Sequence, residues 1–523
     1  MISFDWKTKG GALIEETIHD DKDVRKSELS DLRRKTARGA LVSIVSQAAT
    51  LVFRTGSMVI MARLLLPEDF GLVGMVTAFT GFLSLFRDAG LSMATVQRES
   101  ITDAQLSTLF WINLAVGGLL ALSSAALAPV LVSFYGEPRL FLIAIGLGTA
   151  FIFNGAAAQH RAMLQRNMRF AALAAIDITA LIIGIAAGAA VALTGGGYWA
   201  LVVMTVASPA VSVFGLWAAT RWVPGLPQRN TGIGSMLRYG GTVTLNSVVV
   251  YVAYNADKVL LGRFLGAQVL GIYGRAYQLI NLPTENLNGT IGMVAFPALS
   301  RLQNDPERLR SFFLKGYGLF LALVIPITAG CALFAEDIVL VFLGPQWDAA
   351  VPVFRLLAPT ILAFALMNPF AWLMLATGQT RRSLNIAFMI APVVIVGYLL
   401  GLPYGLHGVA IGYSAAMMIL VPPMVLWAKH GTLITAGDVV KTIASPALSI
   451  ALGALAAFAT WGWLRQLEPA LLRLTAANVV MFGTYAISLL FLMRQGPVYA
   501  SLLKDSGLWP KGAVTGTRKK ITS

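Results

Sequence analysis

The chain has 523 residues, of which 57% are hydrophobic and only 12% are charged. Soluble domains carry about 25% charged residues, and the mean hydropathy of this chain is +0.72, which excludes a soluble globular fold. The net charge of +15 is spread along the flanks of apolar segments. This spread argues against a nucleic-acid surface and favours contact with anionic lipid headgroups. The sequence is that of an all-α polytopic membrane protein.

The composition also argues against several kinds of site. The single cysteine, Cys331, excludes an intrachain disulfide, and the four histidines have no ligand spacing, so no metal and no cofactor is expected. The N-terminal tail is polar and lacks an apolar core, so no cleavable signal peptide is expected.

Fourteen apolar stretches are long enough to cross a bilayer, which takes about 20 residues. Runs of this length indicate helices rather than a barrel, because backbone groups in hydrocarbon must be satisfied internally. The stretch 268–298 is long for one span and is expected to tilt or break around Asn281–Pro283. The expected spans are 39–62, 70–96, 107–133, 139–158, 171–193, 197–220, 238–262, 268–298, 312–334, 350–376, 383–403, 407–428, 441–463 and 471–493.

The lysines and arginines predict the orientation. Most of the 40 fall in the two tails or beside the loops after even-numbered spans, such as Arg161, Arg166 and Arg169 after span 4. The loop after span 9 instead carries Glu336 and Asp337 and has no Lys or Arg. By the positive-inside rule, both termini are expected to be cytoplasmic.

An internal repeat divides the spans into two lobes. Arg63–Gly74 aligns without gaps on Arg263–Gly274, and both copies begin on the same side, so the repeats are parallel. Spans 1–6 and 7–12 are then two pseudo-symmetric six-helix lobes, with spans 13 and 14 added, as in transporters that rock about a central site. The expected divisions are a tail at 1–37, an N-lobe at 38–222, a linker at 223–237, a C-lobe at 238–430, spans 13 and 14 at 431–494 and a tail at 495–523.

Polar side chains recur at helical spacing in spans 1, 2, 7 and 8, which are related by the repeat. Charges within spans normally face a water-filled cavity or a partner, so these stripes are expected to line a pathway. The alternative is that they pair within the protein, which fits Arg87 beside Asp88. The candidate cavity residues are Gln47, Arg54, Asp88, Asn246, Tyr254, Asp257, Lys258, Arg275, Gln278, Asn281 and Glu285.

Two carboxylates are candidates for ion coupling, Glu285 and Asp177, because a carboxyl group held in a membrane can exchange a proton. Asp177 stands alone on an apolar span, where a buried hydrogen-bonded role is the alternative. The charges leave the cargo open. Arg54 and Arg275 suit a phosphorylated anion, whereas Glu285 and Asp257 among tyrosines suit an organic cation or sugar hydroxyls.

Several segments resemble the bacterial polysaccharide transporters of the WzxC type, whose superfamily includes multidrug and toxin extruders and the lipid II flippase. The resemblance covers about residues 35 to 385. The segments that carry it are Ala62–Met75, Phe86–Ser92, Gln105–Asn113, Ala256–Gly266, Arg275–Gln278 and Phe296–Arg301.

The resemblance implies a transporter, not an enzyme, in the bacterial inner membrane. Such relatives move undecaprenyl-diphosphate-linked oligosaccharide repeat units from the cytoplasmic to the periplasmic leaflet, for exopolysaccharide, capsule or O-antigen synthesis. It further implies alternating access, a lipid-side groove at spans 13 and 14, and polysaccharide polymerase or co-polymerase partners.

Two other classes of function compete with this one. The first is an ion-coupled multidrug or organic-cation extruder of the same fold. The second is a membrane glycosyltransferase, polymerase or ligase, which is disfavoured because the longest expected periplasmic loop, 335–350, is too short for a catalytic domain. A structural scaffold would leave the polar stripes unexplained.

Overall fold

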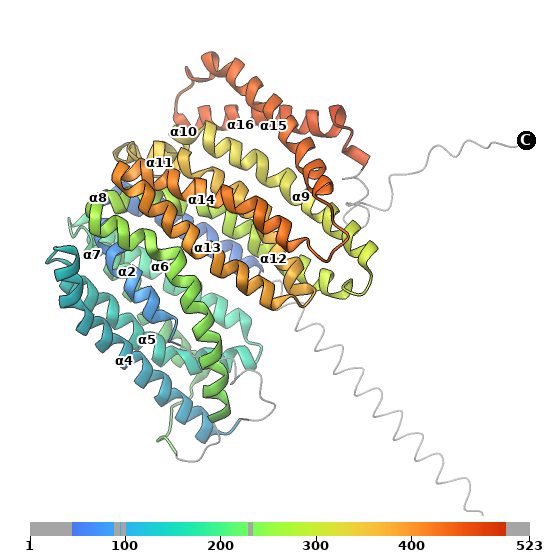
Figure 1. Ribbon diagram of the computed structural model, residues 1–523. Helices are drawn as coiled ribbons and strands as arrows, with labels where there is room; N and C mark the ends of the chain where they lie inside the picture. Colours follow the sequence, from blue (N-terminus) through green and yellow to red (C-terminus); the bar gives the residue numbers. More distant parts are fainter. Residues whose placement is uncertain (1–43, 88–94, 96–100, 229–233, 498–523) are drawn as a thin grey trace, which may run out of the picture. The chain divides into compact units, whose positions relative to one another are not determined.

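The computed structural model describes residues 44–87, 95, 101–228 and 234–497, and every regular element in these residues is helical (Figure 1). This confirms the predicted all-helical class. Within the described residues, ten segments are long and apolar enough to cross a membrane. Two of them, Ala350–Ala376 and Phe388–Ala428, each extend over two helices, and the longest helix, α8 (Gly234–Arg301), is not among the ten. The number of fourteen spans therefore stays a prediction.

The chain divides into two compact units, and the first comprises residues up to Leu65 together with Met75–Val248. In it α4 packs along α5, α6 along α7, and α5 along α7. A capping box at Thr102 begins α4, and Gly136 in the left-handed conformation ends it. Its described helices are Ile44–Leu64, the second part of α2 (Pro67–Ser84), α4 (Asp103–Tyr135), α5 (Leu140–Arg166), α6 (Phe170–Leu193), α7 (Trp199–Thr220) and the start of α8.

The segment 221–228 after α7 is fastened to the start of α4. Gly225 N donates to Ser107 Oγ at 2.9 Å, and Trp111 Nε1 donates to Gly225 O at 2.8 Å. Gln228 N donates to Thr108 Oγ1 at 3.1 Å. The first part of the predicted linker is thus ordered by side chains of α4.

The second unit comprises Leu66–Gly74 and Val249–Ser523. The most extensive helix–helix contacts in it are those of the pairs α13–α14, α15–α16 and α12–α14. Its described helices are the first part of α2, most of α8, α9 (Pro306–Leu333), α10 (Ala335–Phe342), η1 (Pro345–Trp347), α11 (Ala350–Leu357), α12 (Pro359–Ala376), α13 (Thr380–Gly401), η2 (Leu402–Tyr404), α14 (Gly405–Ala428), α15 (Ala436–Leu464), α16 (Ala470–Ile487) and η3 (Ser488–Leu492).

Helix α8 is interrupted at Gly266, where φ is 83° and ψ is 177°. Only glycine adopts this conformation readily. A tilt or a break was expected around Asn281–Pro283. The helix does not break there but continues through Pro283 and Pro297, as membrane helices tolerate proline. The break thus lies between the two stretches expected as spans 7 and 8, rather than inside the second.

The two copies of the repeat meet inside the second unit, through Gly71 of α2 and Gly271 of α8. A Cβ on Gly71 would lie 1.7 Å from Ala267 O, and a Cβ on Gly271 would lie 1.7 Å from Pro67 O. The contact is reciprocal, since residues 67 and 71 of one copy correspond to 267 and 271 of the other. Only glycine permits two backbones to approach this closely.

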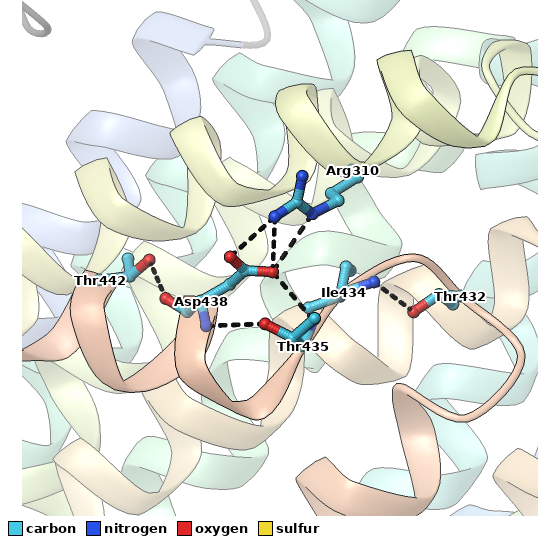
Figure 2. Close-up of polar contacts among 6 residues, drawn as sticks. All are labelled: Arg310, Thr432, Ile434, Thr435, Asp438 and Thr442. Atoms are coloured by element: carbon cyan, nitrogen blue, oxygen red, sulfur yellow. Dashed lines mark hydrogen bonds and ion pairs between the residues drawn. The ribbon is translucent and has the colours of Figure 1, made fainter.

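The last two long helices, α15 and α16, are joined to the rest of the second unit by an ion pair at each end. At the start of α15, Arg310 Nη2 of α9 lies 2.8 Å from Asp438 Oδ1, and Thr435 caps the same helix turn (Figure 2). At the start of α16, Arg473 Nε donates to Asp337 Oδ1 of α10 at 2.8 Å. In the middle, Tyr485 Oη donates to Ala322 O at 2.7 Å.

Candidate substrate-pathway residues

Arg275 lies on α8, one turn beyond the glycine crossing. Its Cζ lies 4.1 Å from the centroid of the Phe70 ring, and that ring meets Trp347, which is fully buried, edge to face at 5.4 Å. The Arg275 Nε is buried and has no hydrogen-bond partner among the described residues. An aromatic face stabilises the cation, but nothing in the described part of the chain neutralises it.

Asp257 lies on the other side of Gly266 and is 1% exposed. Its Oδ1 accepts a hydrogen bond from Lys258 N at 2.8 Å, whereas Lys258 Nζ donates to Asn255 Oδ1 at 2.8 Å. The carboxylate lies within electrostatic range of Tyr251, Tyr273 and Tyr398. A charge this deeply buried is costly unless hydrogen bonds or nearby charges compensate it.

Tyrosines from three helices of the second unit gather near this carboxylate. Tyr273 and Tyr277 of α8 stack with ring centroids 6.0 Å apart, and Tyr398 of α13 stacks on Tyr413 of α14 at 5.2 Å. The Tyr277 and Tyr413 hydroxyl oxygens are 3.5 Å apart. The arrangement places several tyrosine hydroxyl groups close together near the buried Asp257 carboxylate.

Three further predicted residues, Gln278, Asn281 and Glu285, follow Arg275 along α8 without a break in the helix. Gln278 and Glu285 are exposed and Asn281 is partly buried. Asn288, at the next helical step, has a buried Oδ1 without a partner among the described residues. The polar residues of this predicted stripe therefore lie on one helix, and some of their side chains are exposed while others are buried.

The first repeat copy carries its predicted residues on the helix Ile44–Leu64. Gln47 and Arg54 are exposed there, and Arg54 O accepts a hydrogen bond from Ser57 Oγ at 2.8 Å. Asp88 lies outside the described residues, as do the side chains of Asn246 and Tyr254, whose backbone belongs to α8.

Asp177 has a partner that the sequence did not reveal. Arg161 of α5 binds it with both terminal nitrogens, Nη1 to Oδ2 at 2.9 Å and Nη2 to Oδ1 at 2.5 Å. Arg161 was expected in the loop after span 4, but α5 continues to Arg166, so the arginine stands within the helix. Both side chains are partly exposed, at 36% and 42%. The bidentate geometry indicates a structural link between α5 and α6.

Histidine and acidic residues form no metal-ligand group of three or more in the described part of the chain. His160, which is fully buried, instead hydrogen-bonds Thr220 Oγ1 through Nδ1 at 2.8 Å and stacks against Trp217. It therefore serves the packing of α5 on α7.

Sequence reasoning missed the aromatic support of Arg275. Phe70 and Trp347 are far apart in the chain, and no periodic pattern links them. The one available signal was the repeat itself, because Phe70 stands next to Gly71 in a segment that aligns with the start of the Arg275 helix.

Comparison with known proteins shows which family the sequence matches. Residues 60–352 match the model of the family described as polysaccharide biosynthesis protein. The chain is 26% identical to the lipopolysaccharide biosynthesis protein WzxC of Escherichia coli K12, over 74% of this chain and 80% of that one. It is 27% identical to the succinoglycan biosynthesis transport protein ExoT of Rhizobium meliloti, over 60% and 64% of the two chains.

The fold is also found among solved structures. The lipid II flippase MurJ in an inward closed conformation is similar with a TM-score of 0.68 at 14% identity, covering 88% of this chain and 99% of that one. The apolar helices and these similarities show a multi-pass membrane protein. The chain belongs to the polysaccharide biosynthesis protein family.

Proposed function

We propose that the protein is a flippase for undecaprenyl-diphosphate-linked oligosaccharide repeat units. It moves them from the cytoplasmic to the periplasmic leaflet of a bacterial inner membrane, for the synthesis of exopolysaccharide, capsule or O-antigen. The names of the relatives support this role, since they include a polysaccharide transport protein and, by fold, a lipid II flippase.

The main support for the proposal is that the Arg275 side chain is partly buried without a carboxylate partner among the described residues. Its guanidinium is held against Phe70 with one nitrogen unpaired, and it forms no ion pair with a described carboxylate. A charge is costly within a membrane and is kept there for a partner. A guanidinium binds phosphate oxygens through two parallel hydrogen bonds and stays charged in a low dielectric. A diphosphate headgroup fits this requirement, and an organic cation does not.

We also propose a role for each of the other predicted residues. Arg54, Gln47, Asp88, Asn246 and Tyr254 line the hydrated pathway with Lys258, Gln278, Asn281 and Glu285, and Asp257 with the tyrosines offers hydrogen bonds to sugar hydroxyls. For ion coupling, the ion pair of Asp177 with Arg161 favours Glu285, which is exposed.

The proposed organisation follows the repeat. Fourteen spans form two six-helix lobes at 38–222 and 238–430 with the added spans at 431–494, both termini are cytoplasmic, and transport proceeds by alternating access. The membrane partners are a polysaccharide polymerase and co-polymerase, which use the delivered repeat units.

The test is a leaflet-resolved measurement in a deletion strain. Lipid-linked repeat units are extracted after labelling with a sugar-reactive probe that does not cross the inner membrane. The proposal expects unlabelled, cytoplasm-facing intermediates to accumulate and surface polymer to disappear, and the gene for the intact chain to reverse both changes.

Normal polymer with labelled intermediates would contradict the proposal. If the same strain became sensitive to cationic drugs, the extruder function would replace it. Loss of polymer without any accumulated lipid-linked unit would instead indicate a role before translocation.

A further inference from the structure

A basic hollow lies where α12 ends, α13 begins and α14 ends. Gly378, with φ of +75°, reverses the chain between α12 and α13 within three residues. Helices α13 and α14 lie side by side (Figure 1), so the end of α14 borders the start of α13. The hollow measures about 530 Å³ and is lined by Gly378, Gln379, Arg381, Arg382, Asn385 and Trp427.

The arginines of this hollow have no acidic partner in the described part of the chain. Arg382 Nη1 donates to Gln379 Oε1 at 2.5 Å and to His430 O at 2.6 Å, and both acceptors are neutral. No Asp or Glu lines the hollow or stands in the first turn of α13. Gln379 and His430 thus fix the direction of the Arg382 side chain without cancelling its charge.

Two other arginines of the same unit, Arg308 and Arg310, are neutralised by carboxylates. Arg308 pairs with Asp305 at 3.2 Å, and Arg310 pairs with Asp438 at 2.8 Å (Figure 2). Both of these carboxylates also accept backbone hydrogen bonds in the first turns of α9 and α15, as the helix dipole favours. The first turn of α13 departs from this pattern by carrying two cations instead.

This combination of charges suits an anion. The free N–H groups at a helix start carry partial positive charge, and two guanidinium groups beside them add to it. Guanidinium groups match phosphate oxygens in geometry as well as charge. Asn385 stands one helical turn beyond Arg381 on the same face and adds an amide to the hollow.

The position of Trp427 indicates that the hollow lies at the bilayer surface. It is 39% exposed at the end of α14, inside a long apolar segment that qualifies as membrane-spanning. Tryptophan is enriched at the boundary between hydrocarbon and water. We propose that this hollow binds the phosphate group of a lipid headgroup. The site is separate from Arg275, and the inference does not depend on the proposed transport.

The test is a binding measurement on the full chain purified in a nonionic detergent, by native mass spectrometry. The probes are phosphatidylglycerol, a polyprenyl diphosphate, and inorganic pyrophosphate. The variant Arg381→Gln/Arg382→Gln removes the site, and Lys315→Gln/Lys441→Gln removes the same charge from two exposed lysines of the same unit. The variant Arg381→Lys/Arg382→Lys keeps the charge and removes the planar fork, and size-exclusion profiles check that every variant is folded.

We expect the arginine-to-glutamine variant to bind at least one phosphate-bearing lipid about tenfold more weakly or worse, since the charge-assisted hydrogen bonds from both guanidinium groups to phosphate are removed. The lysine pair should change the affinity less than about twofold, because neither lysine lines the hollow and isolated exposed charges contribute little. Tighter binding of polyprenyl diphosphate identifies the cargo headgroup as the ligand, and tighter binding of phosphatidylglycerol identifies a bilayer lipid. Equal losses in both glutamine variants, no loss in either, or equally tight binding of pyrophosphate would overturn the inference.

Discussion

The two copies of the repeat can be compared position by position in the register that pairs Arg63 with Arg263. Gly71 corresponds to Gly271, and each meets the backbone of the opposite copy. Met75, however, corresponds to Arg275. Met75 is buried apolar core at 2% exposure, whereas Arg275 leaves a buried nitrogen unpaired. An apolar side chain therefore suffices for packing at this position in one copy, so packing alone does not explain the arginine in the other.

The same contrast recurs one helix segment earlier. Ser57 corresponds to Asp257 and Met58 to Lys258. Ser57 is partly buried and Asp257 is 1% exposed, whereas Met58 is 4% exposed and Lys258 is partly buried. Only the second copy fully buries a charge at these two positions. We infer that the shared positions maintain the scaffold and that the charges found in one copy alone serve the cargo.

The largest expected effect is at the shared glycines. Gly71→Ala or Gly271→Ala would place a methyl group 1.7 Å from a carbonyl oxygen of the other copy, which should destabilise the fold by about 3 kcal/mol or more. We expect little monodisperse protein on size exclusion. The matched control is Gly274→Ala, where a Cβ meets nothing within 4 Å. Normal yields from both crossing variants would show that the repeats do not depend on this contact.

The next largest effect is expected for Arg275→Met, which replaces the arginine by the residue found at the corresponding position of the first copy, Met75. We expect normal membrane insertion and a loss of polymer export of about tenfold or more, because charge-assisted hydrogen bonds of about 1.5–3 kcal/mol each are removed. Export is measured as surface polymer per amount of protein in the membrane. Met75→Leu, a volume-conserving change in the core, is the control and should export normally. Wild-type export from Arg275→Met would remove the main support for a diphosphate cargo.

The variant Asp257→Asn tests whether the charge of Asp257 serves transport or the stability of the fold. The amide retains an oxygen for the bond from Lys258 N and removes a buried charge, so the thermal unfolding temperature in detergent should stay level or rise. Export should nevertheless fall several-fold. A fall in both quantities would instead assign Asp257 to the scaffold.

The smallest effect is expected at the Arg161–Asp177 pair, which lies outside the compared segments. Asp177→Asn should lower stability by about 1 kcal/mol, because the pair is partly exposed, and should leave export unchanged. The double variant Arg161→Gln/Asp177→Asn should recover most of the lost stability. A large export defect in both variants would make Asp177 the coupling carboxylate.

Periodicity and the repeat predicted the helical class and brought most helix boundaries within a few residues. The end of α5 at Arg166 was not predicted, because Arg161 resembles a loop anchor until its partner on α6 is known. A tilt or break was expected around Asn281–Pro283, since proline is a common cause of a kink, whereas the break in α8 lies at Gly266.

The contacts of individual side chains could not be predicted from the sequence. Both Arg161 and Arg275 are arginines within apolar segments, and only the structure shows that the first is bound by Asp177 and the second is supported by Phe70. Arg381 and Arg382 resemble ordinary positive-inside residues until the turn at Gly378 gathers them into one hollow. Helical spacing records which face a residue occupies, but not what the neighbouring helix presents to it.

Arg275-dependent flipping is tested most directly by translocation with the purified protein in vesicles loaded with a polyprenyl-diphosphate-linked oligosaccharide. The fraction of oligosaccharide that is accessible to an external glycosidase is followed over time for the intact chain, Arg275→Met and Met75→Leu. We predict exchange between leaflets with the intact chain and Met75→Leu, and slower exchange by about tenfold or more with Arg275→Met. Equal rates for all three proteins, or no exchange beyond that of empty vesicles, would contradict this prediction.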